Sequence, residues 1–306
     1  MQPTHTLPYF IVRNDRLKWS VSGLFDKDKF IGDVMRVITT EFELPNPIEA
    51  VYGSPIVLWN DEFLTSPSAK SEIDETLSAY AKLGVATFLT FSNPALTKKD
   101  LDDVSGNYIL EKLAEGKNNG VIVTSDILYD YIRSKYPSLK LKPSLLKIAS
   151  YEGKRDKAFY ESLAERFDRV PVFPMDNMDF DLLKSLEPKD KFEIVVNNGC
   201  IYGCSLYARC HTKSDDILTF DENKKFVQER CKYYNRQVRL KAGEPNEQAL
   251  RNQNLTLAEV DELANAGFEH FNLQGRGEPL WAFVYDLTRY VLEPDFAAPL
   301  VFKIML

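Results

Sequence analysis

Short apolar runs alternate along this chain with longer amphipathic stretches. Most of the runs are rich in β-branched or aromatic residues, and the clearest ones are apolar nearly throughout. That pattern is typical of strands buried on both faces of a parallel sheet. It predicts eight strands, at 8–12, 48–53, 84–91, 120–124, 145–149, 169–173, 192–196 and 268–273.

The stretches between these runs have the spacing of amphipathic helices. Thr97 is a candidate N-cap for one of them. Thr256 and Glu259 have capping-box spacing at the start of another, and Gly267 is its expected stop. Helices are therefore predicted at 27–42, 68–84, 97–116, 157–167, 180–186, 256–267 and 280–292.

This alternation predicts an α/β fold of the (β/α)8 class, a TIM-barrel-like architecture. An open doubly wound sheet is the alternative, but no GxGxxG or P-loop glycine pattern follows the early strands. We expect a single barrel domain over 1–306, in which 200–255 is a long cysteine-bearing insertion after the seventh strand.

Composition narrows the function classes. The 306 residues are 44% hydrophobic and carry a formal net charge of -7, so strong nonspecific nucleic-acid binding is not expected. The N-terminus lacks the basic and apolar regions of a signal peptide. No stretch approaches the roughly eighteen apolar residues of a spanning helix. We expect a cytoplasmic protein with no membrane partner.

The four cysteines of the chain fall in one window with the spacing C-x3-C-x5-C-x20-C: Cys200, Cys204, Cys210 and Cys231. Four unremarkable thiols are one interpretation, but three of these lie in a polar, glycine-bearing loop rather than on an apolar face. Disulfides are a second, which the expected cytoplasmic location disfavours. A metal site is the favoured interpretation.

The spacing leaves two kinds of metal site open. Structural zinc sites usually show paired C-x2–4-C units, and only the first pair fits here. His211 could then replace one cysteine as a zinc ligand. An iron–sulfur cluster also takes four thiolates and accepts irregular spacing, which puts it only slightly ahead of zinc.

Residues that follow the strands of a (β/α)8 barrel line its active-site mouth. Here these positions carry many small polar groups and few strong acids, which predicts a pocket that binds through hydrogen bonds. They are Ser54, Ser92, Asn93, Ser125, Asp126, Ser150, Asp176, Asn177, Asn197, Asn198, Gln274 and Arg276.

Three of these positions are candidate catalytic residues: Arg276, Asp176 and Asn197. The guanidinium of Arg276 suits a carboxylate or phosphate of a substrate, and a salt bridge to a neighbouring loop is its structural alternative. His270 lies within a predicted strand and is expected to be a satisfied core histidine. The chain has no G-x-S-x-G and no HExxH, so a hydrolytic triad or zinc protease is not supported.

Two segments, VNNGC before Cys204 and AGFEHFNLQGRGEP at 266–279, resemble the U32 family of collagenase-like peptidases. The first segment ends the seventh predicted strand. In the second segment, Gly275 and Arg276 match the family pattern. Asn272 and Gln274 stand where the family usually has lysine and glutamate. A weaker similarity covers ERFDRVPVFPMDN at 165–177.

The resemblance implies a barrel core and a [4Fe–4S] cluster. Cys200 and Cys204 match the family best, and Cys210 and Cys231 are inferred as the remaining ligands. It further implies a redox enzyme, or a component of one, with oxygen-independent hydroxylation-type chemistry on a small polar or nucleic-acid-derived substrate. A protein partner subunit is left open.

Two alternatives stay beside this interpretation. One is a zinc-stabilised barrel that acts as a hydrolase or peptidase, and the other is a non-catalytic binding or scaffold subunit.

Overall fold

The computed structural model describes residues 14–41, 43–60, 70–198, 207, 254–275 and 278–293. Within these ranges, parallel strands form one eight-stranded sheet in the order β5-β4-β3-β2-β1-β8-β7-β6. The strands are β1 Lys18–Ser22, β2 Ile48–Gly53, β3 Ala86–Phe91, β4 Gly120–Val123, β5 Lys140–Pro143, β6 Val170–Val172, β7 Phe192–Val195 and β8 His270–Leu273.

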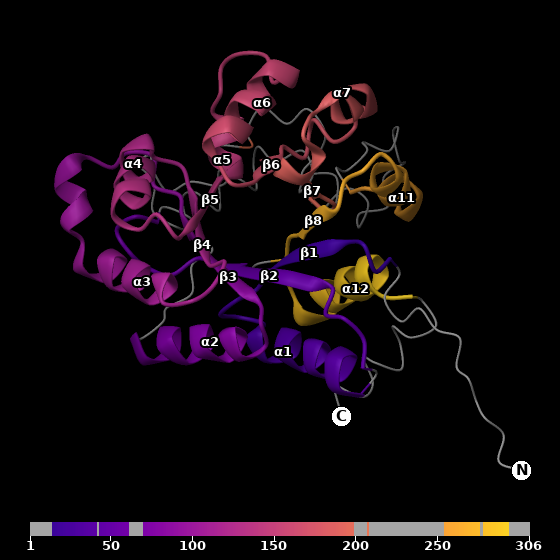
Figure 1. The fold of residues 1–306 in the computed structure, drawn as a ribbon, viewed down its shortest axis with the longest axis horizontal. Helices are drawn as coiled ribbons and strands as arrows, with labels where there is room; N and C mark the ends of the chain where they lie inside the picture. Colours follow the sequence, from indigo (N-terminus) through magenta and orange to yellow (C-terminus); the bar gives the residue numbers. More distant parts are fainter. Residues whose placement is uncertain are drawn as a thin grey trace, which may run out of the picture.

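The two ends of this strand order, β5 and β6, lie beside each other, so the sheet curls into a nearly closed barrel (Figure 1). At this seam the backbone N–H of Asp168 donates to the carbonyl oxygen of Leu141 at 2.9 Å. The N–H of Leu141 donates in return to the Asp168 carboxylate at 2.9 Å. The predicted (β/α)8, TIM-barrel-like fold is confirmed.

Helices surround the barrel (Figure 1). They are α1 Asp28–Arg36, α2 Lys70–Lys82, α3 Val104–Ala114, α4 Asp126–Lys135, α5 Leu145–Ala149, α6 Lys157–Arg166, α7 Phe180–Ser185, α11 Leu257–Asn265 and α12 Leu280–Val291, with short turns η1 Val37–Glu41, η2 Lys98–Asp102 and η3 Lys189–Lys191. Thr256 and Glu259 form the predicted capping box of α11. Thr97 forms a capping box with Asp100 at the start of η2.

The prediction misplaced one strand of the barrel and missed another. The run 145–149 is helix α5, and the strand before it is KLKP, β5. Ser144 joins the two elements, because its hydroxyl accepts from the N–H of Lys147 at 3.0 Å and so caps α5. Ser150 therefore follows a helix, and Ser144 is the polar residue at this strand end. The first barrel strand is β1, whereas the predicted run 8–12 lies outside the described residues.

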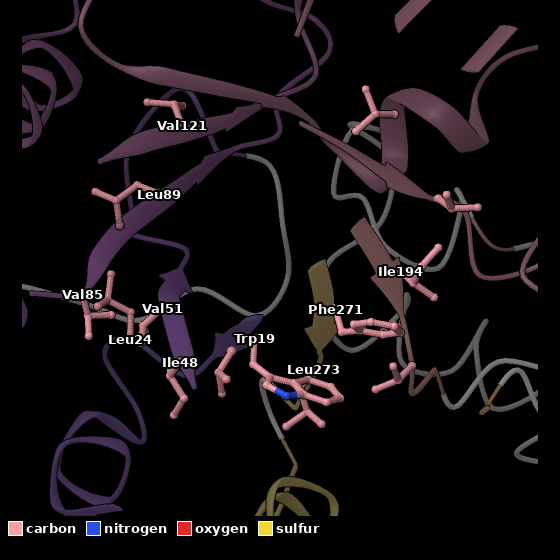
Figure 2. Close-up of a cluster of buried hydrophobic side chains, with 14 of the residues drawn as sticks. Trp19, Leu24, Ile48, Val51, Val85, Leu89, Val121, Ile194, Phe271 and Leu273 are labelled. Carbon is pink, nitrogen blue, oxygen red and sulfur yellow. The ribbon is translucent and has the colours of Figure 1, made fainter. Parts of the chain in front are cut away.

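The outer face of the sheet makes the hydrophobic core against the helices. Figure 2 shows part of this layer, with Val51 on the outer side of β2 and Leu89 on the outer side of β3. Leu89, Val51 and Phe271 are all 0% exposed. Burial of this apolar surface is the main stabilising term for such a fold.

Among the residues that the structure describes, no helix has the length and apolar character needed to cross a membrane.

Candidate functional site

The centre of the barrel holds a buried ion pair. The ammonium of Lys142, from β5, contacts the carboxylate of Glu193, from β7. The two side chains are 6% and 1% exposed. A charge buried this deeply is stable only when it is paired and hydrogen-bonded. The neighbouring strands must therefore supply further partners.

Those partners come from β1 and β8. The hydroxyl of Ser20 donates to Oε2 of Glu193 at 3.0 Å, and Nδ2 of Asn272 donates to Oε1 at 2.7 Å. Nζ of Lys142 also lies 3.3 Å from Oγ of Ser20. Both carboxylate oxygens therefore have donors, and the pair belongs to a network contributed by four strands.

An aromatic ring supports the ammonium group. Nζ of Lys142 lies 4.5 Å from the centroid of Phe88, within cation–π range. Gly120 makes room for this ring, because a Cβ there would lie 2.4 Å from a ring carbon of Phe88. Burial raises the pKa of Glu193, but the positive charges of Lys142 and Arg169 more than offset it, so the pKa lies below its ordinary value.

Small hydroxyl side chains occupy the inner face next to the carboxyl ends of five neighbouring strands. Alternation along each strand and the pairing register put these positions on the same face as Ala50, Tyr52, Ala86 and Phe88, which cluster inside the barrel. The hydroxyl residues are Ser22, Ser54, Thr90, Thr124 and Ser144, and all are buried.

The hydroxyls of Thr124 and Ser144 lie 2.6 Å apart and share a hydrogen bond. Lys142 lies two residues before Ser144, on the same face of β5. The mouth end of the interior is therefore lined by small polar groups on this side of the barrel.

A second polar cluster closes the opposite, amino-terminal end of the strands. Nδ1 of His270 lies 2.8 Å from Oε1 of Glu49, and the guanidinium of Arg169 pairs with the same oxygen. Burial raises the pKa of Glu49, but the hydrogen bond from His270 and the charge of Arg169 outweigh it and lower the pKa to about 2. His270 is thus a partnered core histidine, as predicted.

The amide residues predicted at the mouth bind one another. Nδ2 of Asn197 donates to the carbonyl oxygen of Gln274 at 2.9 Å, and Oδ1 accepts from the N–H of Gln274 at 2.7 Å. Nδ2 of Asn198 donates to the side-chain oxygen of Gln274 at 3.0 Å. These bonds clamp the end of β7 to the end of β8.

Asn197 also reaches helix α12. Its Nδ2 donates to Oδ2 of Asp286 at 2.7 Å. Burial raises the pKa of Asp286, and the contacts with Asn197 and Arg289 only partly offset that rise. The candidate catalytic residue Asn197 therefore holds a half-buried carboxyl group at the mouth.

Asp176, the second candidate catalytic residue, is held by two partners. Nε and Nη2 of Arg155 donate to its two oxygens at 2.7 and 3.1 Å, and the hydroxyl of Tyr160 donates at 2.5 Å. Burial and the charge of Asp176 raise the pKa of Tyr160 well above its ordinary value. This geometry anchors the β6–α7 connection and leaves the catalytic prediction for Asp176 untested.

Arg276, His211 and the four cysteines, Cys200, Cys204, Cys210 and Cys231, lie outside the described residues. Within the described ranges, no group of three or more His, Cys, Asp or Glu side chains could hold a metal ion.

One residue inside the cysteine window is described. Tyr207 is 6% exposed, and its ring packs edge-on against Phe173, with the centroids 4.8 Å apart. Its hydroxyl accepts from Nδ2 of Asn198 at 3.4 Å. Tyr207 therefore lies at the carboxyl ends of β6 and β7, at the barrel mouth.

Sequence reasoning missed the ion pair between Lys142 and Glu193. Its members come from distant segments, and β5 was not recognised as a strand. One signal was available, because Glu193 interrupts the apolar run FEIVV. A charge inside a strand buried on both faces requires a partner from another strand.

Comparisons with known proteins give weak similarities. No family model matches the chain, and no curated protein matches it. Among solved structures, the U32 peptidase Mk0906 is 14% identical, with a TM-score of 0.46, and the match covers 89% of this chain and 98% of that one.

Two further solved structures show similarities of the same low level. A xylose isomerase-like TIM barrel/4-hydroxyphenylpyruvate dioxygenase fusion protein is 12% identical over 87% of this chain and 40% of that one, with a TM-score of 0.41. The C-terminal domain of a putative chitinase from Desulfitobacterium hafniense is 8% identical over 96% of this chain and 100% of that one, with a TM-score of 0.40. Membership of the U32 family stays a prediction.

Proposed function

We propose that this chain is a U32-like iron–sulfur protein with a [4Fe–4S] cluster at the barrel mouth. Its ligands would be Cys200, Cys204, Cys210 and Cys231. The protein would serve as a redox enzyme, or as a component of one, in oxygen-independent hydroxylation-type chemistry. The substrate would be a small polar or nucleic-acid-derived molecule.

The observation that carries the proposal is the position of Tyr207. An extended chain spans at most about 3.6 Å per residue, so three residues reach no further than about 11 Å. Cys204 and Cys210 each lie three residues from Tyr207, and Cys200 lies two residues after Asn198. These short chain distances support a site in which three of the thiols lie near the contact between Tyr207, Phe173 and Asn198.

The donor set fits the proposed group chemically. Four thiolates are the usual ligands of a [4Fe–4S] cluster, and they also suit zinc. When bound, the cluster would supply one-electron redox chemistry. The number of cysteines and their short chain distance from Tyr207 and Asn198 support a metal site at the mouth. The U32 resemblance favours iron and sulfide over zinc.

The described residues around the mouth would orient the site and hold a proton. Asn198 anchors Tyr207 by its side-chain amide, and Asn197 fixes the carboxyl group of Asp286. Because burial raises its pKa, Asp286 keeps its proton to a higher pH than an exposed aspartate does. It would donate a proton to a substrate bound at the mouth.

Anaerobic purification followed by iron, sulfide and zinc analysis tests the proposal. We expect iron and acid-labile sulfide in equal amounts, and we expect Cys200→Ala plus Cys204→Ala to lose both. Ser150→Ala is the matched control, because Ser150 is exposed and follows a helix, and it should keep both. A folded protein that contains neither iron nor sulfide would overturn the proposal.

The zinc-stabilised barrel is the competing outcome of the same analysis. A colourless protein with one zinc per chain, lost in the same double variant, would select that alternative. Replacement of His211 would then show whether histidine or the fourth cysteine completes the site.

A further inference from the structure

Lys142 is a primary amine that the proposed cluster does not use. It is 5% exposed and lies inside the barrel, one inward position below Ser144 on β5. Its ammonium contacts the carboxylate of Glu193, whose lowered pKa makes it a weak base that would hold a transferred proton only briefly. A lysine beside a proton acceptor has the two groups that covalent catalysis on a carbonyl compound requires.

The inward side chains nearest the mouth are mostly small and polar. Tyr52, the register partner of Ser22, also faces inward, and its hydroxyl donates to the side-chain oxygen of Asn272. Ser22, Ser54, Thr90, Thr124 and Ser144 are the inward residues nearest the carboxyl ends of β1 to β5. Hydroxyl groups both donate and accept hydrogen bonds and carry no charge. They therefore suit the hydroxyl and carbonyl oxygens of a neutral, sugar-like molecule better than a phosphate or a carboxylate.

One of these hydroxyls is unsatisfied. Oγ of Ser22 is buried and has no hydrogen-bond partner within the described part of the chain. Buried polar atoms are nearly always paired, so an unpaired one is explained by an ordered water or by a ligand that binds there. The β8–α12 connection lies directly beside this atom, because a Cβ on Gly275 would come within 3.5 Å of Oγ.

We propose that the mouth half of the barrel interior binds a small hydroxy-aldehyde or hydroxy-ketone and that Lys142 forms a Schiff base with its carbonyl carbon. The inference goes beyond the metal site and does not depend on it. The hydroxyls at the ends of β1 to β5 hold the hydroxyl groups of the substrate. Phe88 and Ser20 hold the amine toward the interior.

Lys142 and Glu193 can exchange every proton that this reaction moves. Lys142 transfers a proton to Glu193, and the neutral amine attacks the carbonyl carbon, forming a C–N bond. The carbonyl oxygen takes the proton that the attacking nitrogen releases and becomes the hydroxyl of a carbinolamine. That hydroxyl leaves as water with the proton returned by Glu193, and an iminium ion remains. Ammonium and carbonyl are thus converted to iminium and water.

Reductive trapping on the native, full-length protein tests this inference. The protein is incubated with glycolaldehyde or dihydroxyacetone and cyanoborohydride, and its lysines are mapped by peptide mass spectrometry. We expect a reduced adduct on Lys142 at a yield several-fold above that on Lys98, which is exposed and reports ordinary surface reactivity. An unmodified Lys142 in a sample whose exposed lysines are labelled would overturn the proposal.

Glu193→Gln separates catalysis from simple access. Glutamine keeps the size of the side chain but cannot take the proton, so the adduct on Lys142 should form several-fold more slowly, with labelling of Lys98 unchanged. Circular dichroism verifies that the variant is folded. Equal trapping rates in a folded variant would exclude the proton-transfer role. Iron and sulfide contents are measured on the same samples, so failure of the cluster proposal and failure of this one are read separately.

Discussion

The two faces of the same barrel sheet have opposite chemistry. On the outer face, Leu89, Val51 and Phe271 are fully buried against the helices. On the inner face, Lys142 and Glu193 are buried almost as deeply but are held by hydrogen bonds. The outer layer stabilises the fold through apolar burial, whereas the inner layer keeps charged groups in place. The comparison therefore separates residues that hold the barrel together from residues that can react.

The largest expected effect comes from breaking the inner ion pair. Lys142→Met would leave the carboxylate of Glu193 buried without its cation, and such a change costs about 3–5 kcal/mol. We expect a loss of that size in the free energy of unfolding, measured by urea denaturation. A loss below about 1 kcal/mol, the usual range for exposed pairs, would contradict the buried pair.

Two second-site changes sharpen this result. Adding Glu193→Leu to Lys142→Met removes the orphaned charge, so much of the lost stability should return. Asn272 already bonds to Glu193 and stands where the resembled family usually has lysine. Asn272→Lys should therefore also restore stability in the Lys142→Met background. If neither change recovers stability, the damage is not caused by the unpaired carboxylate.

On the outer face we expect a loss of stability that is caused by a cavity and not by an unpaired charge. Leu89→Ala removes a side chain that is 0% exposed, and buried leucine-to-alanine changes cost about 2–5 kcal/mol. No second-site charge change should rescue it. Leu280→Ala is the control, because Leu280 is 42% exposed and should change the free energy of unfolding by less than about 0.5 kcal/mol. Equal losses in the two variants would contradict the described packing.

We expect low pH to reduce the stability of the protein by protonating Glu49, in the polar cluster at the amino-terminal end of the strands. The pKa of Glu49 falls from 4.5 to about 2 in the folded protein. Its stabilising contribution is then complete above about pH 4.5 and is lost as the pH falls toward 2. A shift of this size corresponds to roughly 3 kcal/mol.

Glu49→Gln isolates this term, because glutamine cannot titrate. The free energy of unfolding of the wild-type protein minus that of the variant should shrink between pH 5 and pH 2. A difference that stays constant across this range would show that Glu49 does not titrate with a lowered pKa.

The smallest expected effect is at a helix cap on the surface. The hydroxyl of Thr256 accepts from the N–H of Glu259 at 3.2 Å, and loss of such a cap costs about 1 kcal/mol. Thr256→Ala should lower the thermal midpoint by a few degrees, and Thr256→Ser should restore most of it. A larger loss of stability in Thr256→Ala than in Lys142→Met would contradict the expectation that the buried ion pair stabilises the protein more than a surface helix cap.

The outer face could be predicted from sequence more fully than the inner one. Strands β3, β4, β7 and β8 were found because their apolar runs reflect burial on both faces. Two strands with polar inner residues were missed, β1 with Ser20 and Ser22 and β5 with Lys142. The apolar run after β5 was taken for a strand, because short buried helices and strands share that pattern.

The candidate site was only partly predictable for a different reason. Asn197, Asn198 and Gln274 were placed at the mouth from their positions after strands, and the structure finds them there, clamped to one another. The partners of Glu193 lie on β1, β5 and β8, and no local pattern connects residues that far apart in the chain. Only the closed barrel brings them together.

X-ray absorption at the iron and zinc edges of the anaerobically purified protein tests the central functional proposal most directly. The proposal predicts iron coordinated by sulfur, with further iron atoms as near neighbours, and loss of this signal in Cys200→Ala plus Cys204→Ala. Zinc coordinated by sulfur, or no metal at either edge in a folded protein, would contradict it.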